Sequence, residues 1–200
     1  MSLIDLEKFK ADLGITDSAF DNRLTELIDR VEEFIAKQAF GSAQLEADDG
    51  EQAEDKTEWH NGKGGDVLNL DEYPVDPENL TSLEINGEDQ GDPVGNDDEF
   101  SESGWFLEKP EWGKLRMIND VFPRGVRNIK ICYKPGWPAG EVPGPVVEVC
   151  YRCLAGLWNQ KEHIGLSQVA FDSNAVSLVL KSILDETTMA FLNPYRRPRI

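Results

Sequence analysis

The chain has 200 residues, of which 40% are apolar and 29% are charged, and its formal net charge is −18. This apolar content is enough for a hydrophobic core, so the composition excludes a chain that is disordered throughout. The strong acidity argues against a protein that grips the phosphates of nucleic acid.

The N-terminal part has the apolar spacing of two helices. Residues 3–14 carry apolar side chains on one side of a short helix, and Gly14 is placed to end it. From Ser18 to Gly41, apolar residues recur at steps of three and four, which predicts a long amphipathic helix.

All of the excess negative charge lies between Gly41 and Gly104. This segment holds 20 acids and 2 bases, whereas the rest of the chain is balanced. Its first part, residues 42–55, is acidic, small and aperiodic, which predicts a mobile loop. Such a concentration of acids is typical of a solvated face.

Short runs with β propensity, separated by turn residues, fill residues 56–137 and predict an antiparallel β-subdomain. The expected strands are Thr57–His60, Val67–Leu70, Leu80–Asn86, Gly104–Leu107, Lys114–Ile118 and Asn128–Lys134. The run Gly62–Gly65 is expected to be a hairpin turn, because it lacks the Ser or Thr and the helix that a phosphate loop requires. The tryptophans of this region are expected to supply its core.

A second long helix follows a proline-rich stretch. Pro145 is well placed as its first residue, and its wide apolar stripe predicts packing against the first long helix. Residues 165–180 are expected to be extended, and residues 181–192 to form a final short helix. The tail, residues 193–200, contains two prolines and is expected to be extended.

Together these elements predict an α+β fold. It consists of a small helical bundle, with two long helices and short N- and C-terminal helices, an inserted antiparallel β-subdomain and an extended C-terminal tail. Residues 1–41 and 138–192 are expected to form the discontinuous helical domain, and residues 56–137 the β insertion. Residues 42–55 would be an acidic loop and residues 193–200 a basic arm.

The sequence contains no recognisable catalytic or metal-binding motif, and we expect neither enzymatic activity nor a cofactor. His60 and His163 lie far apart and near no motif. Cys150 and Cys153 share the apolar side of a helix, so core thiols are favoured over a zinc or redox pair. With Cys132 the count is odd, and no signal-peptide pattern is visible, which predicts a chain folded in a reducing cytoplasm.

Two ligand sites remain open as alternatives. Asp92, Asp97, Asp98 and Glu99 are dense enough to coordinate calcium, although their order does not fit an EF-hand. The tryptophans and their neighbouring turns can form a carbohydrate-binding surface. The alternative function is therefore a carbohydrate- or calcium-binding β-module on a helical support, and a hydrolase that depends on one of the histidines is a third.

The order of motifs along the chain resembles a known family. The motifs are His60–Gly65, Leu68–Leu70, Tyr73–Val75, Asn128–Trp137, Val142–Pro143, Gly165–Ser167, Val176–Leu178 and Leu192–Arg197. In this order and spacing, nearly the whole chain resembles the head–tail connector, or adaptor, proteins of tailed bacteriophages and gene transfer agents. The resemblance is to the longer members, which carry a β insertion between two main helices. The acidic loop 44–54 does not match that pattern, and the turn 91–102 is unusually acidic for it.

The resemblance implies a structural protein of the virion neck, made in the cytoplasm of the host bacterium. Such adaptors form a ring, commonly of twelve copies, beneath the portal protein. The ring extends the DNA channel, through which DNA passes without sequence-specific binding, and it docks tail or stopper proteins. The family's C-terminal segment grips the portal, and here this role falls on Phe191, Tyr195, Arg196, Arg197, Arg199 and Ile200.

The tail has physical properties that suit docking. Its prolines keep it extended and lower the entropy lost on binding. Its arginines offer planar groups with several donors, which match carboxylates on a partner, and Tyr195 and Ile200 can fill apolar pockets. The alternative is an ordinary frayed terminus.

Overall fold

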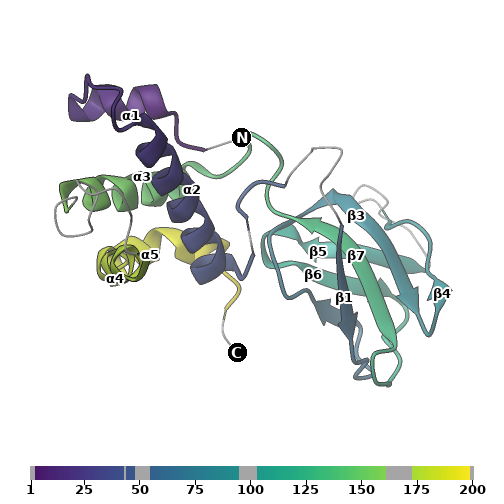
Figure 1. Ribbon diagram of the computed structural model, residues 1–200. Coiled ribbons are helices and arrows are strands. Elements are labelled where there is room, and N and C mark those ends of the chain that lie inside the picture. The colour runs from purple at the N-terminus through teal and green to yellow at the C-terminus, as the bar shows by residue number, and fades with distance from the viewer. Residues whose placement is uncertain (1–2, 43, 48–54, 95–102, 161–172, 199–200) are drawn as a thin grey trace. The chain divides into compact units, whose positions relative to one another are not determined.

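A computed structural model describes residues 3–42, 44–47, 55–94, 103–160 and 173–198 (Figure 1). The described residues include five α-helices and two antiparallel sheets, which confirms the predicted α+β class. The chain folds into two compact units. We call the first the helical unit, Met1–Ala39 with Gly140–Pro194, and the second the β unit, Phe40–Ala139 with Tyr195–Ile200.

The helical unit is built around two long helices. Its helices are α1 (Leu6–Leu13), α2 (Asp21–Ile35), α3 (Gly144–Asn159), α4 (Ser173–Ile183) and α5 (Glu186–Leu192). Helix α2 packs against α3, as predicted, and α3 also packs against α4 and α5. The buried side chains are Leu24, Leu27, Ile28, Val31 and Ile35 from α2, and Val146, Val149, Cys150, Cys153, Leu154, Leu157 and Trp158 from α3. They recur at three- and four-residue steps, so each helix presents one apolar side to the other.

The ends of the helices follow local chemistry. The Asp5 carboxylate accepts hydrogen bonds from the backbone N–H groups of Glu7 and Lys8 and caps α1, which Gly14 ends with a φ of 67°. A π-helical turn, Ala36–Phe40, continues α2 as far as Gly41. Pro145 lies in the first turn of α3, where its missing N–H costs no helical hydrogen bond.

The prediction of an extended segment over residues 165–180 is wrong for residues 173–180, which belong to α4. Val176 and Leu180 are buried and Leu178 is 68% exposed. Burial of residues four apart fits a helix as well as a strand, so the apparent alternation was ambiguous. Residues 161–172 lie outside the described part of the chain.

The predicted final helix, residues 181–192, is also divided. Helix α4 ends at Ile183, and α5 begins after Asp185. The Asp185 carboxylate accepts the Thr188 N–H at 2.7 Å, so it caps a new helix rather than continuing the old one. This hydrogen bond also lowers the pKa of Asp185.

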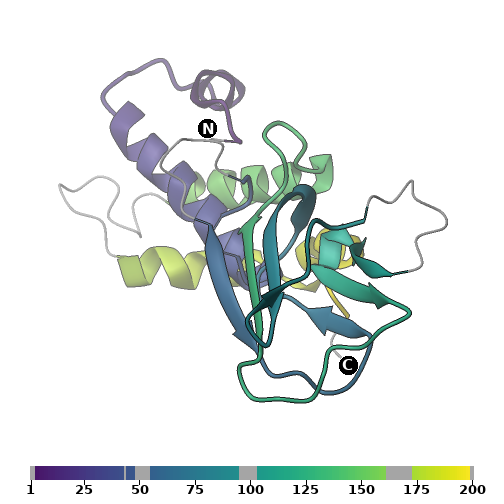
Figure 2. The ribbon, with the colours of Figure 1, turned by 90° about the vertical axis from the view of Figure 1, so that its right-hand side faces the viewer.

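The β unit consists of two sheets (Figure 2). Its strands are β1 (Lys56–His60), β2 (Val67–Asn69), β3 (Val75–Ile85), β4 (Glu88–Asp89), β5 (Gly104–Lys109), β6 (Lys114–Ile118) and β7 (Ile129–Pro135). One sheet has the order β1-β7-β3-β4 and the other β2-β6-β5, with every pair antiparallel. The inward side chains form one apolar cluster that includes Leu70, Leu83, Trp105, Leu115 and Ile131.

The Gly62–Gly65 segment is not the expected hairpin turn. It joins β1 to β2, and these strands belong to different sheets because β1 pairs with β7 and β2 with β6. The turn between β3 and β4 is a true hairpin. Asn86 and Gly87 both have positive φ, 53° and 82°, as a tight two-residue turn requires.

The expected mobile loop over residues 42–55 is wrong for its first residues. Ser42, Leu45 and Ala47 are buried. The Ala47 N–H donates to the Trp137 carbonyl at 2.7 Å, and the Trp137 N–H donates to the Leu45 carbonyl at 2.8 Å. This pairing holds the segment against the end of β7, whereas residues 48–54 lie outside the described residues.

The tryptophans divide between core and surface. Trp105 and Trp137 are buried, as expected, whereas Trp59 is 49% exposed and its neighbour Glu58 is buried. In β1 the charged Glu58 thus faces the interior and the apolar Trp59 faces outward, the reverse of what their polarity predicts. Glu58 can face inward because it has fixed hydrogen-bond partners inside the unit. Among the described residues, no helix combines the length and apolar character needed to span a membrane.

Candidate partner-binding site

The C-terminal segment contacts the β unit through its own arginine. The prediction of an extended tail is wrong for its first residues, because a 3-10 turn, Asn193–Tyr195, follows α5 before the backbone continues through residues 196–198. Arg197 donates from Nε to the Trp112 carbonyl at 2.9 Å and from Nη2 to the Leu70 carbonyl at 2.6 Å. Its guanidinium lies over the Tyr73 ring, with Cζ 4.6 Å from the ring centroid. The tail is thus anchored on its own chain at this residue.

The environment of Arg197 is half-buried. Burial lowers the pKa of its guanidinium, while Tyr73 and Asp71 act in the opposite direction. The two carbonyl oxygens accept hydrogen bonds from the edge of the planar guanidinium, and the Tyr73 ring packs against its face. A lysine has a single compact ammonium and cannot reproduce this arrangement.

An aromatic cluster holds Tyr195 nearby. The Tyr195 and Trp137 rings meet edge to face, with centroids 6.5 Å apart. Trp137 in turn meets Phe40 at 4.9 Å, and Phe40 meets Tyr73 at 6.1 Å. We call Leu70, Tyr73, Trp112 and Trp137 the tail seat, because these residues receive Tyr195 and Arg197.

The loop that carries Leu70 and Tyr73 is fixed from inside the β unit. The buried Glu58 carboxylate accepts the Asp71 N–H at 3.0 Å. The Tyr133 hydroxyl donates to the same carboxylate and accepts the Glu72 N–H at 3.2 Å. The tail seat therefore rests on a network of buried hydrogen bonds, which is a more rigid support than exposed side chains provide.

Glu58 is the centre of this network. Its carboxylate also contacts Lys56 Nζ at 3.0 Å and His60 Nε2 at 2.8 Å. Burial alone would raise the pKa of Glu58, but hydrogen bonds from His60, Tyr133, the Asp71 N–H and Lys56 outweigh it and lower the pKa to about 2. Burial and the Glu58 contact raise the pKa of Tyr133. The carboxylate is therefore ionised and its hydroxyl partner remains a donor.

A second segment packs closely against the same loop. The Leu70 N–H donates to the Gly113 carbonyl at 2.9 Å. A Cβ at Gly113 would lie 3.2 Å from the Cβ atoms of both Leu70 and Tyr73, and Gly113 has a φ of 55°. A glycine is required here because the backbone that offers the Trp112 carbonyl must approach the loop closely.

Glu58, His60 and Asp71 bring three potential metal ligands within 4.8 Å of one another. However, the Glu58 oxygens already accept hydrogen bonds from four groups. The Glu58 carboxylate therefore has its hydrogen-bonding capacity filled by the protein and does not require a metal ion.

The six residues predicted to contact a partner are not brought together by the described structure. Tyr195 and Arg197 lie in the tail seat, and Arg196 is half-buried. Phe191 belongs to α5 of the helical unit, is 39% exposed and lies under Arg152, whose Cζ is 4.9 Å from its ring centroid. Arg199 and Ile200 lie outside the described residues, and the partner contact of all six stays a prediction.

Sequence reasoning missed the tail seat and the Glu58 network. The residues of the seat come from three separate segments, and no short motif joins them. The sequence around Glu58 does carry one indication of the network, because a lysine and a histidine stand two positions before and after it in the same predicted strand region. Side chains two apart on a strand share a face, so the three were able to interact.

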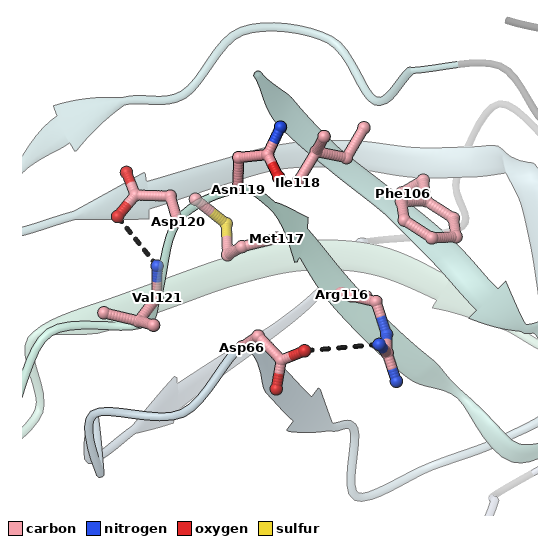
Figure 3. A pocket seen from close by; sticks show the side chains of 8 residues that line it. All are labelled: Asp66, Phe106, Arg116, Met117, Ile118, Asn119, Asp120 and Val121. Atoms are coloured by element: carbon pink, nitrogen blue, oxygen red, sulfur yellow. Dashed lines mark hydrogen bonds and ion pairs between the residues drawn. The ribbon is translucent and has the colours of Figure 1, made fainter. Parts of the chain in front are cut away.

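A hollow of about 450 Å³ lies beside β6 (Figure 3). Within it Arg116 pairs with Asp66 at 3.2 Å, and the Asp120 carboxylate accepts the Val121 N–H at 2.7 Å. Arg116 also pairs with Glu108 at 3.1 Å. Because its charge is balanced by two acids, this hollow has no built-in preference for an anion.

The structure also places several other residues that the sequence singles out as possible sites. Cys150 and Cys153 are buried thiols of α3, as predicted, and burial raises the pKa of Cys153 to about 12. Of the acids that the sequence offers as calcium ligands, Asp92 is exposed, and Asp97, Asp98 and Glu99 lie outside the described residues. Among the five tryptophans, all of them described, only Trp59 is exposed, which gives little support to a carbohydrate platform. His163 lies outside the described residues.

No protein-family model matches the sequence, and no curated protein matches it. Among solved structures, the chain is similar to a chain of the structure described as "Neck of native GTA particle computed with C12 symmetry". The two chains share 17% identity with a TM-score of 0.47. The alignment covers 98% of this chain and 89% of the other.

Proposed function

We propose that the protein is a structural component of the neck of a tailed phage or a related particle, where copies of it form a ring beneath the portal protein. The observation that carries the proposal is the ordered set of sequence motifs, which resembles head–tail adaptors along nearly the whole chain. In this role the ring extends the DNA channel and offers a docking surface to tail or stopper proteins.

The positions of these motifs in the fold support the proposal. Tyr73 and Trp137 belong to separate motifs, and both contact the tail motif through Arg197 and Tyr195. In the same way, Gly62 of one motif is bound to Asn128 of another, since the Gly62 N–H donates to Asn128 Oδ1 at 2.8 Å. Motifs far apart in the sequence thus meet in pairs, as expected if they maintain one architecture.

We further propose that the tail is the portal-binding arm and that Arg197 is its anchor. The hydrogen bonds of Arg197 fix the base of the arm on the β unit. An anchored base lowers the conformational entropy that the following residues lose when they dock. The predicted portal contacts are Arg199 and Ile200, which follow the anchor in the sequence, together with Phe191, Tyr195 and Arg196.

The test compares two variants in a portal pull-down. Removal of residues 199–200 should abolish or strongly weaken portal binding and leave the melting temperature unchanged, because the anchor remains. Removal of residues 193–200 should abolish binding and also lower the stability of the β unit. Undiminished capture of portal by the longer deletion would contradict the role of the arm.

The acidity of the chain supports a channel that DNA passes without adhesion. The acids outnumber the bases by 38 to 20. Like charge repels the DNA backbone, and this repulsion is strongest at low salt. Binding of duplex DNA by the isolated protein, measured by fluorescence anisotropy at low salt, would contradict this part of the proposal.

A further inference from the structure

One sheet of the β unit carries opposite charge at two places, namely the loops that follow β1 and precede β7, and the edge formed by β4. The order β1-β7-β3-β4 places β1 and β4 at its two edges (Figure 1). A cross-strand row runs from Trp59 through Lys130 and Glu84 to Asp89, and Lys130 and Glu84 pair at 2.6 Å within it. The chemistry at the two ends of this row differs.

The β1 side ends in a basic tip, which we define as Lys63, Arg124 and Arg127 with the apolar residues Trp59 and Val126. Arg127 lies over the Trp59 ring, with Cζ 5.4 Å from the centroid. Trp59 is 49% exposed and Val126 is 83% exposed. Exposed aromatic and arginine side chains of this kind are enriched at protein interfaces. Two acids lie in the same loops, and one of them, Asp66, pairs with Arg116.

The two loops of the basic tip are bound to each other. The Arg127 N–H donates to Asn61 Oδ1 at 2.7 Å, and the Gly125 N–H donates to the Gly62 carbonyl at 3.1 Å. Asn128 Nδ2 donates to the Pro123 carbonyl at 2.9 Å. A hollow of about 350 Å³, with Trp59 and Lys63 in its lining, opens beside them. Since the loops are held in place, little ordering entropy opposes a contact with a partner.

The other side of the sheet ends in an acidic edge, which we define as Glu88, Asp89 and Asp92. All three residues are exposed. The sequence has no lysine or arginine between Lys63 and Lys109, so no base lies next to these acids along the chain. Strand β4 has only two residues, which leaves a short edge whose surface is set by its carboxylates.

We infer that a second copy of this chain docks its acidic edge on the basic tip of the first, so that β units meet head to tail. A contact between two identical patches would bring like charges together, whereas a tip-to-edge contact brings opposite charges together. Head-to-tail contacts of one kind generate a ring when the rotation between copies closes. The inference rests on the proposed ring and assigns the surfaces through which its copies meet.

The experiment is a charge-reversal cycle on the full chain. Self-association of the wild type, Arg127→Glu, Glu88→Lys and the double variant is measured by sedimentation velocity over a range of concentrations at low salt. Each single variant should raise the dissociation constant between copies by about tenfold or more, because it places like charges across the contact. The double variant should restore association, because the two charges are opposite again.

Two controls keep the outcome interpretable. Lys8→Glu makes the same change of charge on the exposed surface of α1 and should leave association unchanged. Arg124→Glu alters the tip at a second residue and should weaken association in the same direction as Arg127→Glu. Melting temperatures of all variants check that the fold is intact.

The possible results distinguish failure of the tip-to-edge contact from failure of the proposed neck function. If the wild type associates but no variant changes it, or if the wild type stays monomeric at every concentration, the tip-to-edge contact is wrong. Loss of DNA binding by Arg127→Glu without any change in self-association would also overturn it, because the tip would then serve nucleic acid. The neck function is judged independently by whether the protein forms rings on purified portal in electron micrographs.

Discussion

The helical unit and the β unit bury different chemistry. In the helical unit, α2 and α3 meet through mainly aliphatic and thiol side chains. The buried base of this unit, Lys10 of α1, pairs with Asp21 of α2 at 2.6 Å. In the β unit a carboxylate, Glu58, is almost fully buried and accepts hydrogen bonds from three segments. An apolar core tolerates small shifts between helices, whereas a buried carboxylate requires each donor at a fixed position. The β unit is thus the part that is built to hold a precise surface, and the tail is anchored there.

The sharpest test of this difference removes the buried carboxylate. Glu58→Ala leaves Lys56, His60 and the Tyr133 hydroxyl without their shared acceptor, and loss of one partner from a buried ion pair costs about 3–5 kcal/mol. We expect the free energy of unfolding of the β unit to fall by about 4 kcal/mol. Urea unfolding followed by tryptophan fluorescence measures it, since four of the five tryptophans, including the buried Trp105 and Trp137, belong to this unit.

The matched control lies in the helical unit. Leu27 is fully buried in α2, and Leu27→Ala should cost about 3 kcal/mol through lost packing and a residual cavity. This loss should be the same at every pH, because no titratable group is involved. A loss below about 1 kcal/mol for Glu58→Ala would mean that the carboxylate is replaceable and that the two units do not differ in this way.

The second prediction uses pH to separate the units. The pKa of Glu58 is about 2, below its ordinary value of 4.5. A lowered pKa in the folded state contributes stability that is present above pH 4.5 and is lost as the pH falls towards 2. The full shift corresponds to about 3 kcal/mol. Glu58→Gln keeps the shape but does not titrate, so its free energy of unfolding should lack this part of the acid dependence.

A third prediction concerns the anchor of the tail. Arg197→Ala removes hydrogen bonds to two carbonyls and the contact with the Tyr73 ring, and should lower the stability of the β unit by about 2 kcal/mol. Arg197→Lys should recover less than half of this, because an ammonium cannot bridge both carbonyls in one plane. Differential scanning calorimetry of the three proteins gives the comparison. Equal stability of the lysine variant and the wild type would show that charge alone holds the tail.

The same contrast explains what the sequence could predict. The packing of α2 on α3 follows from apolar residues at three- and four-residue steps, and strand β6 has the bounds that its turn residues predict, Lys114–Ile118. These features depend on neighbours in the chain. Glu58 is an inward-facing acid beside an outward-facing tryptophan, and only partners from distant segments, Tyr133 and the Asp71 N–H, make that orientation favourable.

The candidate site was predictable only in part. The arginines and prolines of the tail predict a binding segment, but the Arg197 hydrogen bonds in its seat go to two backbone carbonyls, at Leu70 and Trp112, that any residue type could supply. Backbone groups leave no trace in composition or spacing. The helix at residues 173–183 was missed for a different reason, since its burial of residues four apart also fits a strand.

The smallest expected effect comes from an exposed ion pair of the helical unit. Lys37 and Glu33 lie four residues apart and pair at 2.5 Å, with 57% and 55% of their side chains exposed. Water screens both charges, and holding two long side chains together costs entropy, so Lys37→Ala should change the stability by less than about 0.5 kcal/mol. Thermal melting at low and high salt measures it, and the small effect should vanish at high salt because it is electrostatic. Arg197 uses contacts of similar length, so a loss for Lys37→Ala as large as that for Arg197→Ala would mean that burial and fixed acceptors are not what distinguishes the β unit.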